Sequence, residues 1–336
     1  MKALKIVQLI LYLVLIVFLV GIIIVFVNGK MNFNQIFHIE PAVQISETTE
    51  KSSDIEKIST ELLDVDIRIL EGSEDQVRVV YLGPKSEMED PKVTVSLDGD
   101  ELRIVQEGNT FQIFQWTTTS RTIEIYVPEN CDASYDLRTA SGDLKSDLAI
   151  DAPEFSLKLL SGDVSLTSLE TDKAQINLTS GSLSMDRLIA NTTSIDAKSG
   201  DINIGEFESD AELRVLSGDV NITSFTHKLN MNLSSGDILI SSFSGSGDIH
   251  TTAGSIDLQI VESNGDLDIS STSGDVSVKL SEAVSYRFDV NTVAGDVTTN
   301  IPTINSGDNH VSGEIGEDPA YELTVQVTAG DVLLND

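Results

Sequence analysis

The chain has 336 residues, of which 40% are hydrophobic, enough for one membrane anchor and one large folded domain. Residues 31–336 carry 54 acidic and 18 basic side chains, a net charge of −36. Such a surface repels nucleic acids, anionic lipids and anionic wall polymers, so we exclude nucleic-acid binding. The one cysteine, Cys131, has no intrachain disulfide partner. We expect a buried thiol there, with a dimer linked through it as the alternative.

The first element is an uncharged apolar segment over residues 6–27. At about 22 residues it is long enough to cross a bilayer as one helix. Lys2 and Lys5 precede it and only Lys30 follows closely, which favours a cytoplasmic N-terminus over residues 1–5. A cleaved signal peptide is the alternative, although its apolar core would be shorter and no small-x-small cleavage motif precedes Lys30. The anchor predicts a single-pass protein of the cell membrane with its C-terminal part outside the cytoplasm.

Residues 28–53 contain Pro41, scattered charge and no sustained period, which predicts a stalk or linker. An all-β extracytoplasmic domain is expected over 54–336. Its first part predicts short strands separated by irregular segments, and Pro128 ends the last of them. These strands are Val65–Ile69, Val77–Val80, Val93–Val95, Leu102–Val105 and Thr122–Val127. We expect them to form a less regular β layer that caps the structure after it.

The segment 111–116 is the aromatic-rich part of this layer and holds the one tryptophan, Trp116. Packing into the core or the cap is the expected role of these side chains. A ridge on which a sugar or a protein partner stacks is the alternative.

From Ser141 onward a short phrase, Ser-Gly-Asp followed by alternating apolar residues, recurs with small variations. Its glycines are spaced by 20, 19, 19, 18, 18, 18, 20, 21 and 35 residues. They are Gly142, Gly162, Gly181, Gly200, Gly218, Gly236, Gly254, Gly274, Gly295 and Gly330. A period near 19 residues is typical of stacked repeats, and glycine supplies the positive φ that a sharp corner requires.

Apolar residues keep a fixed register with each glycine. They alternate with polar residues two and four positions after it and three and five before it, so each arm is a strand with one buried face. A third apolar residue often follows at seven positions: Leu169, Leu188, Phe207, Phe225, Phe243 and Val261. We predict a β-solenoid of about ten coils of 18–21 residues, preceded by one transmembrane helix. An antiparallel meander or sandwich with a hairpin at each Ser-Gly-Asp is the alternative.

Near its end the repeat is interrupted by a polar loop over residues 301–321. We expect the strand after this loop, around Val332 to Leu334, to end the stack or to lack a separate cap.

The repeated aspartates are the first candidates for a site. Stacked coils place Asp201, Asp219 and Asp237 along one edge about 5 Å apart, where they must accept backbone hydrogen bonds or share cations such as Ca²⁺. Calcium-binding β-rolls repeat Gly-Gly-x-Gly-x-Asp on both edges, whereas serine replaces aspartate after Gly181 and Gly254 here. We therefore expect structural corners, no cofactor and no assigned metal ligand, with a cation edge as the alternative.

No catalytic residue is assigned. The four histidines are far apart and lack metal-ligand spacing, and the chain has neither a Gly-x-Ser-x-Gly elbow nor a phosphate-binding loop. Coils this short leave little room for the loop-walled groove that a polysaccharide-cleaving β-helix needs.

The membrane segment, the strand Thr122–Val127 with Pro128, and the repeats resemble the "putative-adhesin" β-solenoid family. In layout the chain is most similar to its LiaG-type membrane-anchored members in Gram-positive bacteria, and the similarity covers about residues 54–335. The resemblance implies an extracytoplasmic envelope protein linked with responses to cell-wall-active antibiotics and with surface attachment, and it implies no catalytic residues.

We therefore expect a binding or adhesin-like module that is not an enzyme. It would be anchored in the cytoplasmic membrane through residues 6–27 and would bind cationic peptides, an envelope protein or a cell-surface ligand. A carbohydrate-active β-helix enzyme and a purely structural spacer are the alternatives.

Overall fold

The computed structural model describes residues 41–72, 75–107, 120–129 and 131–336. The predicted anchor 6–27, the N-terminus 1–5 and the aromatic segment 111–116 lie outside them. Within the described ranges, no helix is long and apolar enough to cross a membrane. The fold there is all-β, with two short 3-10 helices, η1 (Ser52–Asp54) and η2 (Lys85–Glu87).

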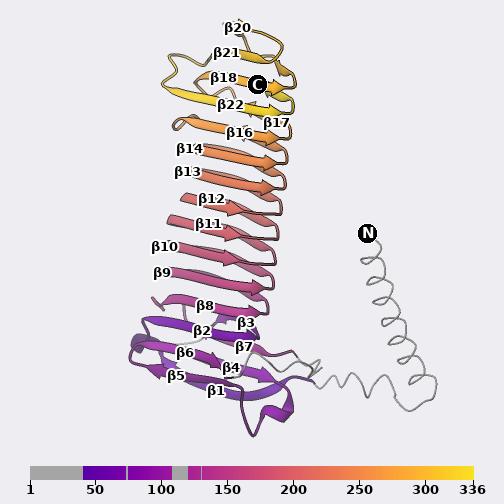
Figure 1. The fold of residues 1–336 in the computed structure, drawn as a ribbon. Coiled ribbons are helices and arrows are strands. Elements are labelled where there is room, and N and C mark those ends of the chain that lie inside the picture. Colours follow the sequence, from indigo (N-terminus) through magenta and orange to yellow (C-terminus); the bar gives the residue numbers. More distant parts are fainter. Residues whose placement is uncertain (1–40, 73–74, 108–119, 130) are drawn as a thin grey trace, which may run out of the picture.

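The centre of the molecule is a stack of parallel coils (Figure 1). Each long strand starts after one Ser-Gly-Asp corner, bends around the core and ends at the next corner, and it pairs in parallel with the coils before and after it. The long strands are β9 (Leu144–Ser161), β10 (Val164–Leu178), β11 (Leu183–Ala197), β12 (Ile202–Val215), β13 (Val220–Ser235) and β14 (Ile238–Ala253). Shorter strands that cover only part of a coil continue the stack at its two ends: β8 (Ser134–Ser141), β15 (Ile256–Ile260), β16 (Leu267–Ser273) and β17 (Val276–Leu280). The predicted solenoid is confirmed, and the antiparallel alternative is wrong because the stack pairs in parallel.

Equivalent apolar residues meet across the coils because the coils pair in register. Ile202 pairs with Val220 and Val220 with Ile238, all buried. At the bend the rings of Phe207 and Phe225 lie 5.2 Å apart edge to face, and those of Phe225 and Phe243 lie 5.6 Å apart and stacked. Burial of each ring stabilises the fold by about 1.5–3 kcal/mol.

In the next coil the predicted bend residue, Val261, is only half-buried. Ile260 pairs with Phe243 and is fully buried, because the register shifts between Ile240 and Phe243.

The corner glycines bring backbones into direct contact. All ten predicted glycines have φ between +123° and +155°. A Cβ on Gly200 would lie 2.1 Å from the carbonyl oxygen of Gly181 in the preceding coil. A side chain is therefore excluded twice, by the left-handed conformation and by the carbonyl below it.

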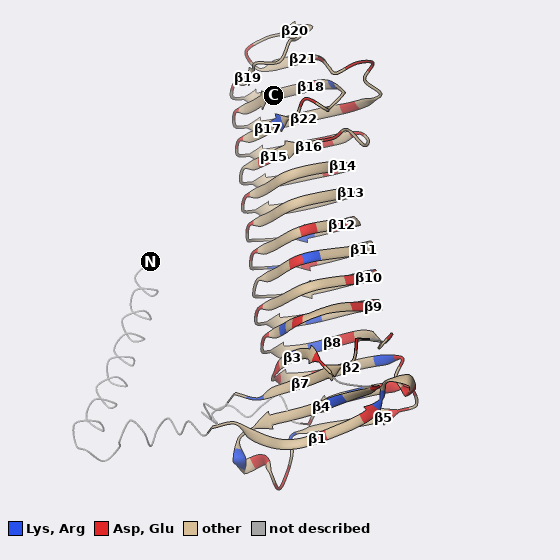
Figure 2. Ribbon diagram, turned by 180° about the vertical axis from the view of Figure 1, so that it is seen from behind, with Lys and Arg blue, Asp and Glu red and all other residues tan. Residues whose placement is uncertain are grey.

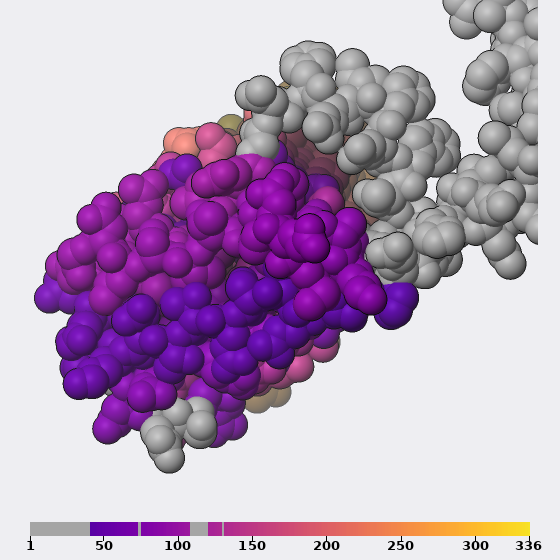
Figure 3. All heavy atoms as spheres, turned by 90° about the horizontal axis from the view of Figure 1, so that it is seen from below, coloured from indigo at the N-terminus to yellow at the C-terminus, as the bar shows by residue number. Residues whose placement is uncertain are grey.

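The N-terminal layer closes one end of the stack, as the sequence predicts (Figure 3). Its strands are β1 (Val43–Lys51), β2 (Lys57–Asp64), β3 (Asp66–Glu71), β4 (Gln76–Gly83), β5 (Val93–Asp98), β6 (Glu101–Gln106) and β7 (Thr122–Val127). β2 lies between β6 and β8, and β3 lies between β7 and β9. Antiparallel strands β5, β4 and β1 complete the layer on the far side.

Strand β1 corrects the predicted linker 28–53. Residues 43–51 pair antiparallel with β4 and belong to the folded layer. The amino-acid pattern hardly indicates this strand, because β1 is an edge strand with only two apolar residues, Val43 and Ile45, and neither is fully buried.

A buried ion pair fixes η2 to this layer. Arg121 Nη2 lies 2.7 Å from Glu87 Oε1, its Nη1 lies 2.6 Å from Asp64 Oδ2, and the Tyr81 hydroxyl donates to Glu87. Burial and the Glu87 carboxylate raise the pKa of Tyr81 above its ordinary value. Cys131 is a buried free thiol, and burial raises its pKa as well.

The C-terminal end departs from chain order. Its strands are β18 (Tyr286–Ala294), β19 (Val297–Thr299), β20 (Asn305–Ser306), β21 (His310–Ile315), β22 (Tyr321–Ala329) and β23 (Val332–Asn335). β22 lies between β16 and β18, and β23 lies between β17 and β19. β20 and β21 from the predicted polar loop cover β18 with antiparallel pairing. The last coil therefore neither ends the stack nor lacks a cap, because the preceding coil covers it.

We expect Gly200→Ala to lower the free energy of unfolding by roughly 2–5 kcal/mol, because the left-handed conformation and the displaced Gly181 carbonyl both oppose a methyl group. Urea denaturation measures this. Gly99→Ala is the matched control: φ there is +69° but nothing lies within 4 Å of the added carbon, so a cost of about 1 kcal/mol is expected. Equal losses in the two variants would contradict the role of close backbone contact.

Candidate functional site

The corner edge is occupied by a ladder of backbone-to-carboxylate hydrogen bonds. The N–H of Asp219 donates to Asp201 Oδ1 at 2.9 Å, and the N–H of Asp237 donates to Asp219 Oδ1 at 2.9 Å. The same contact joins Asp143 to Asp163 and Asp237 to Ser255. The aspartate of each coil thus holds the corner of the next.

The hydrogen bonds of the corner backbone explain why aspartate follows the corner glycine. In the corner after Gly162, the N–H groups of Gly162 and Val164 donate to carbonyls of the next coil. The N–H of Asp163 between them donates instead to the Asp143 carboxylate. The preceding aspartate therefore supplies the partner of this backbone donor. Where Ser182 replaces aspartate, its hydroxyl accepts at a longer 3.3 Å.

The structure therefore gives Asp201, Asp219 and Asp237 a structural task. Over the part of the chain that the structure describes, no three His, Cys, Asp or Glu side chains are grouped to hold a metal ion. We assign no Ca²⁺ or other cation to this edge.

The opposite edge of the stack carries a hollow that the sequence did not predict, here called the edge groove. It runs past the bends of β9 to β13 and has a volume of about 880 Å³. Pro153, Ile189 and His227 contribute to its wall. Six carboxylates line it: Asp132, Asp151, Glu170, Asp172, Glu208 and Asp210. Figure 2 shows acidic residues along both edges of the stack.

The pairing register sets the pattern of the groove. Asp151, Glu170, Ile189 and Glu208 occupy one column on successive coils. Since neighbouring strands are about 4.8 Å apart, Glu170 and Glu208 flank the half-buried Ile189 across about 10 Å. The column thus presents carboxylates on both sides of an apolar centre.

Among the described residues, no lysine or arginine lines this groove, although Lys173 and Lys228 line the neighbouring hollow that shares Asp210 with it. Arg187 reaches Glu170 at 3.7 Å from the neighbouring face. Among the described residues, Asp151, Asp172, Glu208 and Asp210 form no ion pair, and Asn191 donates to Asp172 Oδ1 at 2.7 Å. The groove is therefore a negative, partly apolar surface that favours a cationic ligand.

A sequence signal for this groove existed. Glu170 and Glu208 both stand eight positions after a corner glycine, and Asp172 and Asp210 both stand ten positions after one. The recurrence is easily missed because acidic residues are frequent throughout the chain and Ile189 and Asn191 replace them in the coil between.

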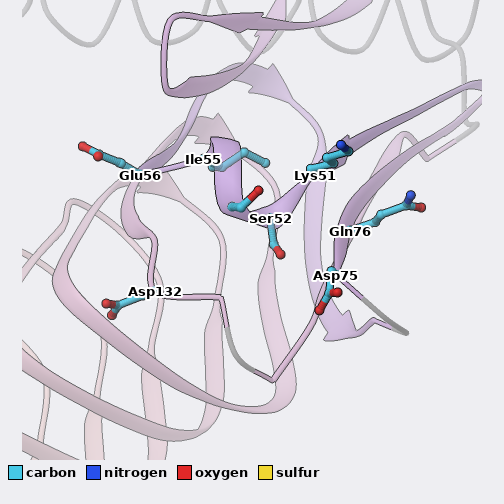
Figure 4. Close-up of a pocket in the computed structure, with 8 residues that line it drawn as sticks. Lys51, Ser52, Ile55, Glu56, Asp75, Gln76 and Asp132 are labelled. Atoms are coloured by element: carbon cyan, nitrogen blue, oxygen red, sulfur yellow. The ribbon is translucent and has the colours of Figure 1, made fainter.

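A second hollow of about 740 Å³ adjoins the groove at the N-terminal layer. Figure 4 shows its lining, with Glu56 and Asp132 on one side and Lys51 and Asp75 on the other. Asp132 lines both hollows, so the acidic surface continues to the capped end of the stack.

The described histidines do not come together. His227 lies at the edge groove, His250 Nδ1 lies 2.9 Å from Ser270 Oγ, and His310 Nε2 lies 3.4 Å from Asp289. His38 lies outside the described residues. His250 and Ser270 form a base–hydroxyl pair, but among the described residues no carboxylate is hydrogen-bonded to His250, so the pair lacks the orienting acid of a catalytic triad.

Comparison with known families assigns the chain to a family. Residues 55–228 and 210–335 match the family described as Toastrack DUF4097. The chain belongs to the Toastrack DUF4097 family. The resemblance to the "putative-adhesin" β-solenoid family is thereby confirmed at the level of the family.

Three solved structures are similar to this Toastrack chain. A putative adhesin from Parabacteroides distasonis is 10% identical, with 86% of this chain and 96% of that chain covered and a TM-score of 0.43. A putative lipid binding protein from the same species is 12% identical, with 86% and 96% covered and a TM-score of 0.39. A putative adhesin from Parabacteroides merdae is 10% identical, with 86% and 95% covered and a TM-score of 0.38. Comparison with curated proteins gave no match.

The ladder predicts different effects of two substitutions at Asp219. We expect Asp219→Ala to lower the free energy of unfolding by about 1 kcal/mol, because the N–H of Asp237 loses its acceptor, whereas Asp219→Asn keeps an acceptor oxygen and stays near wild type. Thermal melting of the 31–336 fragment compares the variants in calcium, magnesium, chelator and sodium of matched ionic strength. A large calcium-specific rise in melting temperature that Asp219→Asn abolishes would contradict the structural role.

Proposed function

We propose that this Toastrack protein is a membrane-anchored, extracytoplasmic binding module of the bacterial cell envelope, and that its edge groove binds cationic peptides. The observation that carries the proposal is the groove itself: carboxylates flank an apolar centre, and none of the described residues that line its wall is a lysine or an arginine. The expected role in the response to cell-wall-active antibiotics or cationic peptides follows from such binding.

The location rests on the N-terminal sequence. The uncharged segment 6–27 would anchor the chain in the cytoplasmic membrane, and residues 28–42 would connect it to the folded layer on the outer side.

The chemistry of the groove favours an amphipathic cation over a bare metal ion. Each exposed ion pair contributes roughly 0.2–1 kcal/mol, so several pairs are needed for useful affinity. A peptide with two cationic groups about 10 Å apart would reach Glu170 and Glu208 together, and an apolar side chain between them would cover Ile189.

A structural spacer is the second candidate. The regular, densely hydrogen-bonded stack is a rigid rod, which a spacer requires, but a spacer does not require a continuous acidic groove. We regard the protein as a binding module without catalysis.

The test is titration calorimetry of the 31–336 fragment with the peptide Lys-Ser-Leu-Ser-Lys, which when extended places both lysines and the leucine on one face, at low and at moderate salt. We expect the affinity to fall in moderate salt, because exposed charges are screened. Neutralising Asp151, Glu170, Asp172 and Glu208 as Asn or Gln should weaken binding roughly 10- to 100-fold at low salt.

A matched control separates the groove from net charge. Asp257→Asn, Glu282→Gln, Asp308→Asn and Glu314→Gln remove the same charge from exposed residues away from the groove. We expect this variant to stay within about threefold of wild type, since only screened long-range attraction is lost. Equal losses in both variants, or binding that ignores salt, would refute the groove as the site, and no binding at all would favour the spacer.

A further inference from the structure

The last coil of the chain, β22 and β23, occupies an internal slot of the stack. It lies between the coil of β16 and β17 and the coil of β18 and β19, and it pairs in parallel and in register with both. Figure 1 shows β22 beneath β18 and β21, although it follows them in the chain.

On both sides of the slot, the coils are joined by the same kinds of contact that join the rest of the stack. The N–H of Gly274 donates to Ala329 O, and the N–H of Gly330 donates to Ala294 O, both at 3.0 Å. The aspartate ladder also passes through the slot: the N–H of Asp331 donates to Asp275 Oδ1, and the N–H of Asp296 donates to Asp331 Oδ1, both at 2.9 Å. Nothing in these contacts depends on which copy of the chain supplies the coil.

The cap depends on this inserted coil. Within the described residues, β18 pairs only with β22 and β21, and β19 pairs only with β23. Whenever residues 321–335 are out of the slot, β16 and β17 on one side and β18 and β19 on the other present unpaired strand edges to it.

The connection into the slot is under backbone strain. Gly316 has φ +81° and Asp318 has φ +48°, and Pro319 follows directly. A left-handed aspartate before proline is unfavourable, since proline restricts the preceding residue to extended conformations. Hydrogen bonds from Ser285 Oγ to Glu317 O and from Arg287 Nη1 to Pro319 O hold this turn closed. An extended connection would release the strain.

We propose that two copies of this protein exchange their C-terminal coils, so that residues 321–335 of each copy fill the slot of the other. The exchange re-forms every ladder contact of the slot and changes only the connection at residues 316–320, which is the usual condition for domain swapping. It supplies a route to dimers that does not use the edge groove.

Cross-linking of two separately labelled copies tests the exchange. Ser270 of β16 and Gln326 of β22 are register partners on the outer face, and neighbouring strands at about 4.8 Å permit a disulfide. Full-length Ser270→Cys and Gln326→Cys proteins in detergent are mixed, partly unfolded in urea, refolded together and oxidised. We expect a covalent dimer whose 270–326 disulfide is mapped by mass spectrometry, at least about tenfold above the control pair.

The control pair is Asn203→Cys mixed with Asn221→Cys, register partners in the middle of the stack that consecutive coils supply. A single chain carrying both Ser270→Cys and Gln326→Cys verifies the register by forming the disulfide within one molecule. If that chain cross-links internally while the mixture gives no more dimer than the control pair, exchange is refuted. Asp318→Gly, which relieves the left-handed strain, should reduce the dimer yield of the mixture, and an unchanged yield would refute the role of the hinge.

Discussion

Close contact between successive corner glycines is the constraint on which the rest of this structure depends. The carbonyl of one glycine lies where the Cβ of the next would be, so the coils reach strand spacing at the corner only if every copy lacks a side chain. With that spacing set, the core residues fall into columns, and Phe207, Phe225 and Phe243 can pack on one another at the bend.

The two edges of the stack therefore have different roles. At the corner edge each aspartate supplies the acceptor that the next coil's backbone lacks, so its charge has a structural use. The bends on the other edge tolerate many residue types, and the carboxylates there have few partners. The repeated aspartates serve the corners, and the acidic surface of the edge groove lies on the opposite edge.

The period of the glycines and the alternation around them sufficed to predict a parallel solenoid, because each coil repeats the same local contacts. What could not be predicted depends on non-local pairing. Strand β1 has too few apolar residues to show an alternating pattern, and it forms because it pairs antiparallel with β4. The groove is formed by residues of successive coils that the pairing register aligns in columns. Glu170 and Glu208 share one column because both pair with Ile189.

The position of the last coil shows the limit of a repeat most clearly. All coils carry variants of the same Ser-Gly-Asp motif. The motif therefore specifies that Gly330 stacks on a corner glycine, but not on which one. The order is decided by the connections: residues 281–285 lead from β17 to β18, past the position that β22 and β23 occupy, and the hairpin of β20 and β21 returns the chain to that position. Uniform coil interfaces give the stack its regularity, and the same uniformity leaves the identity of each coil's neighbour to the loops.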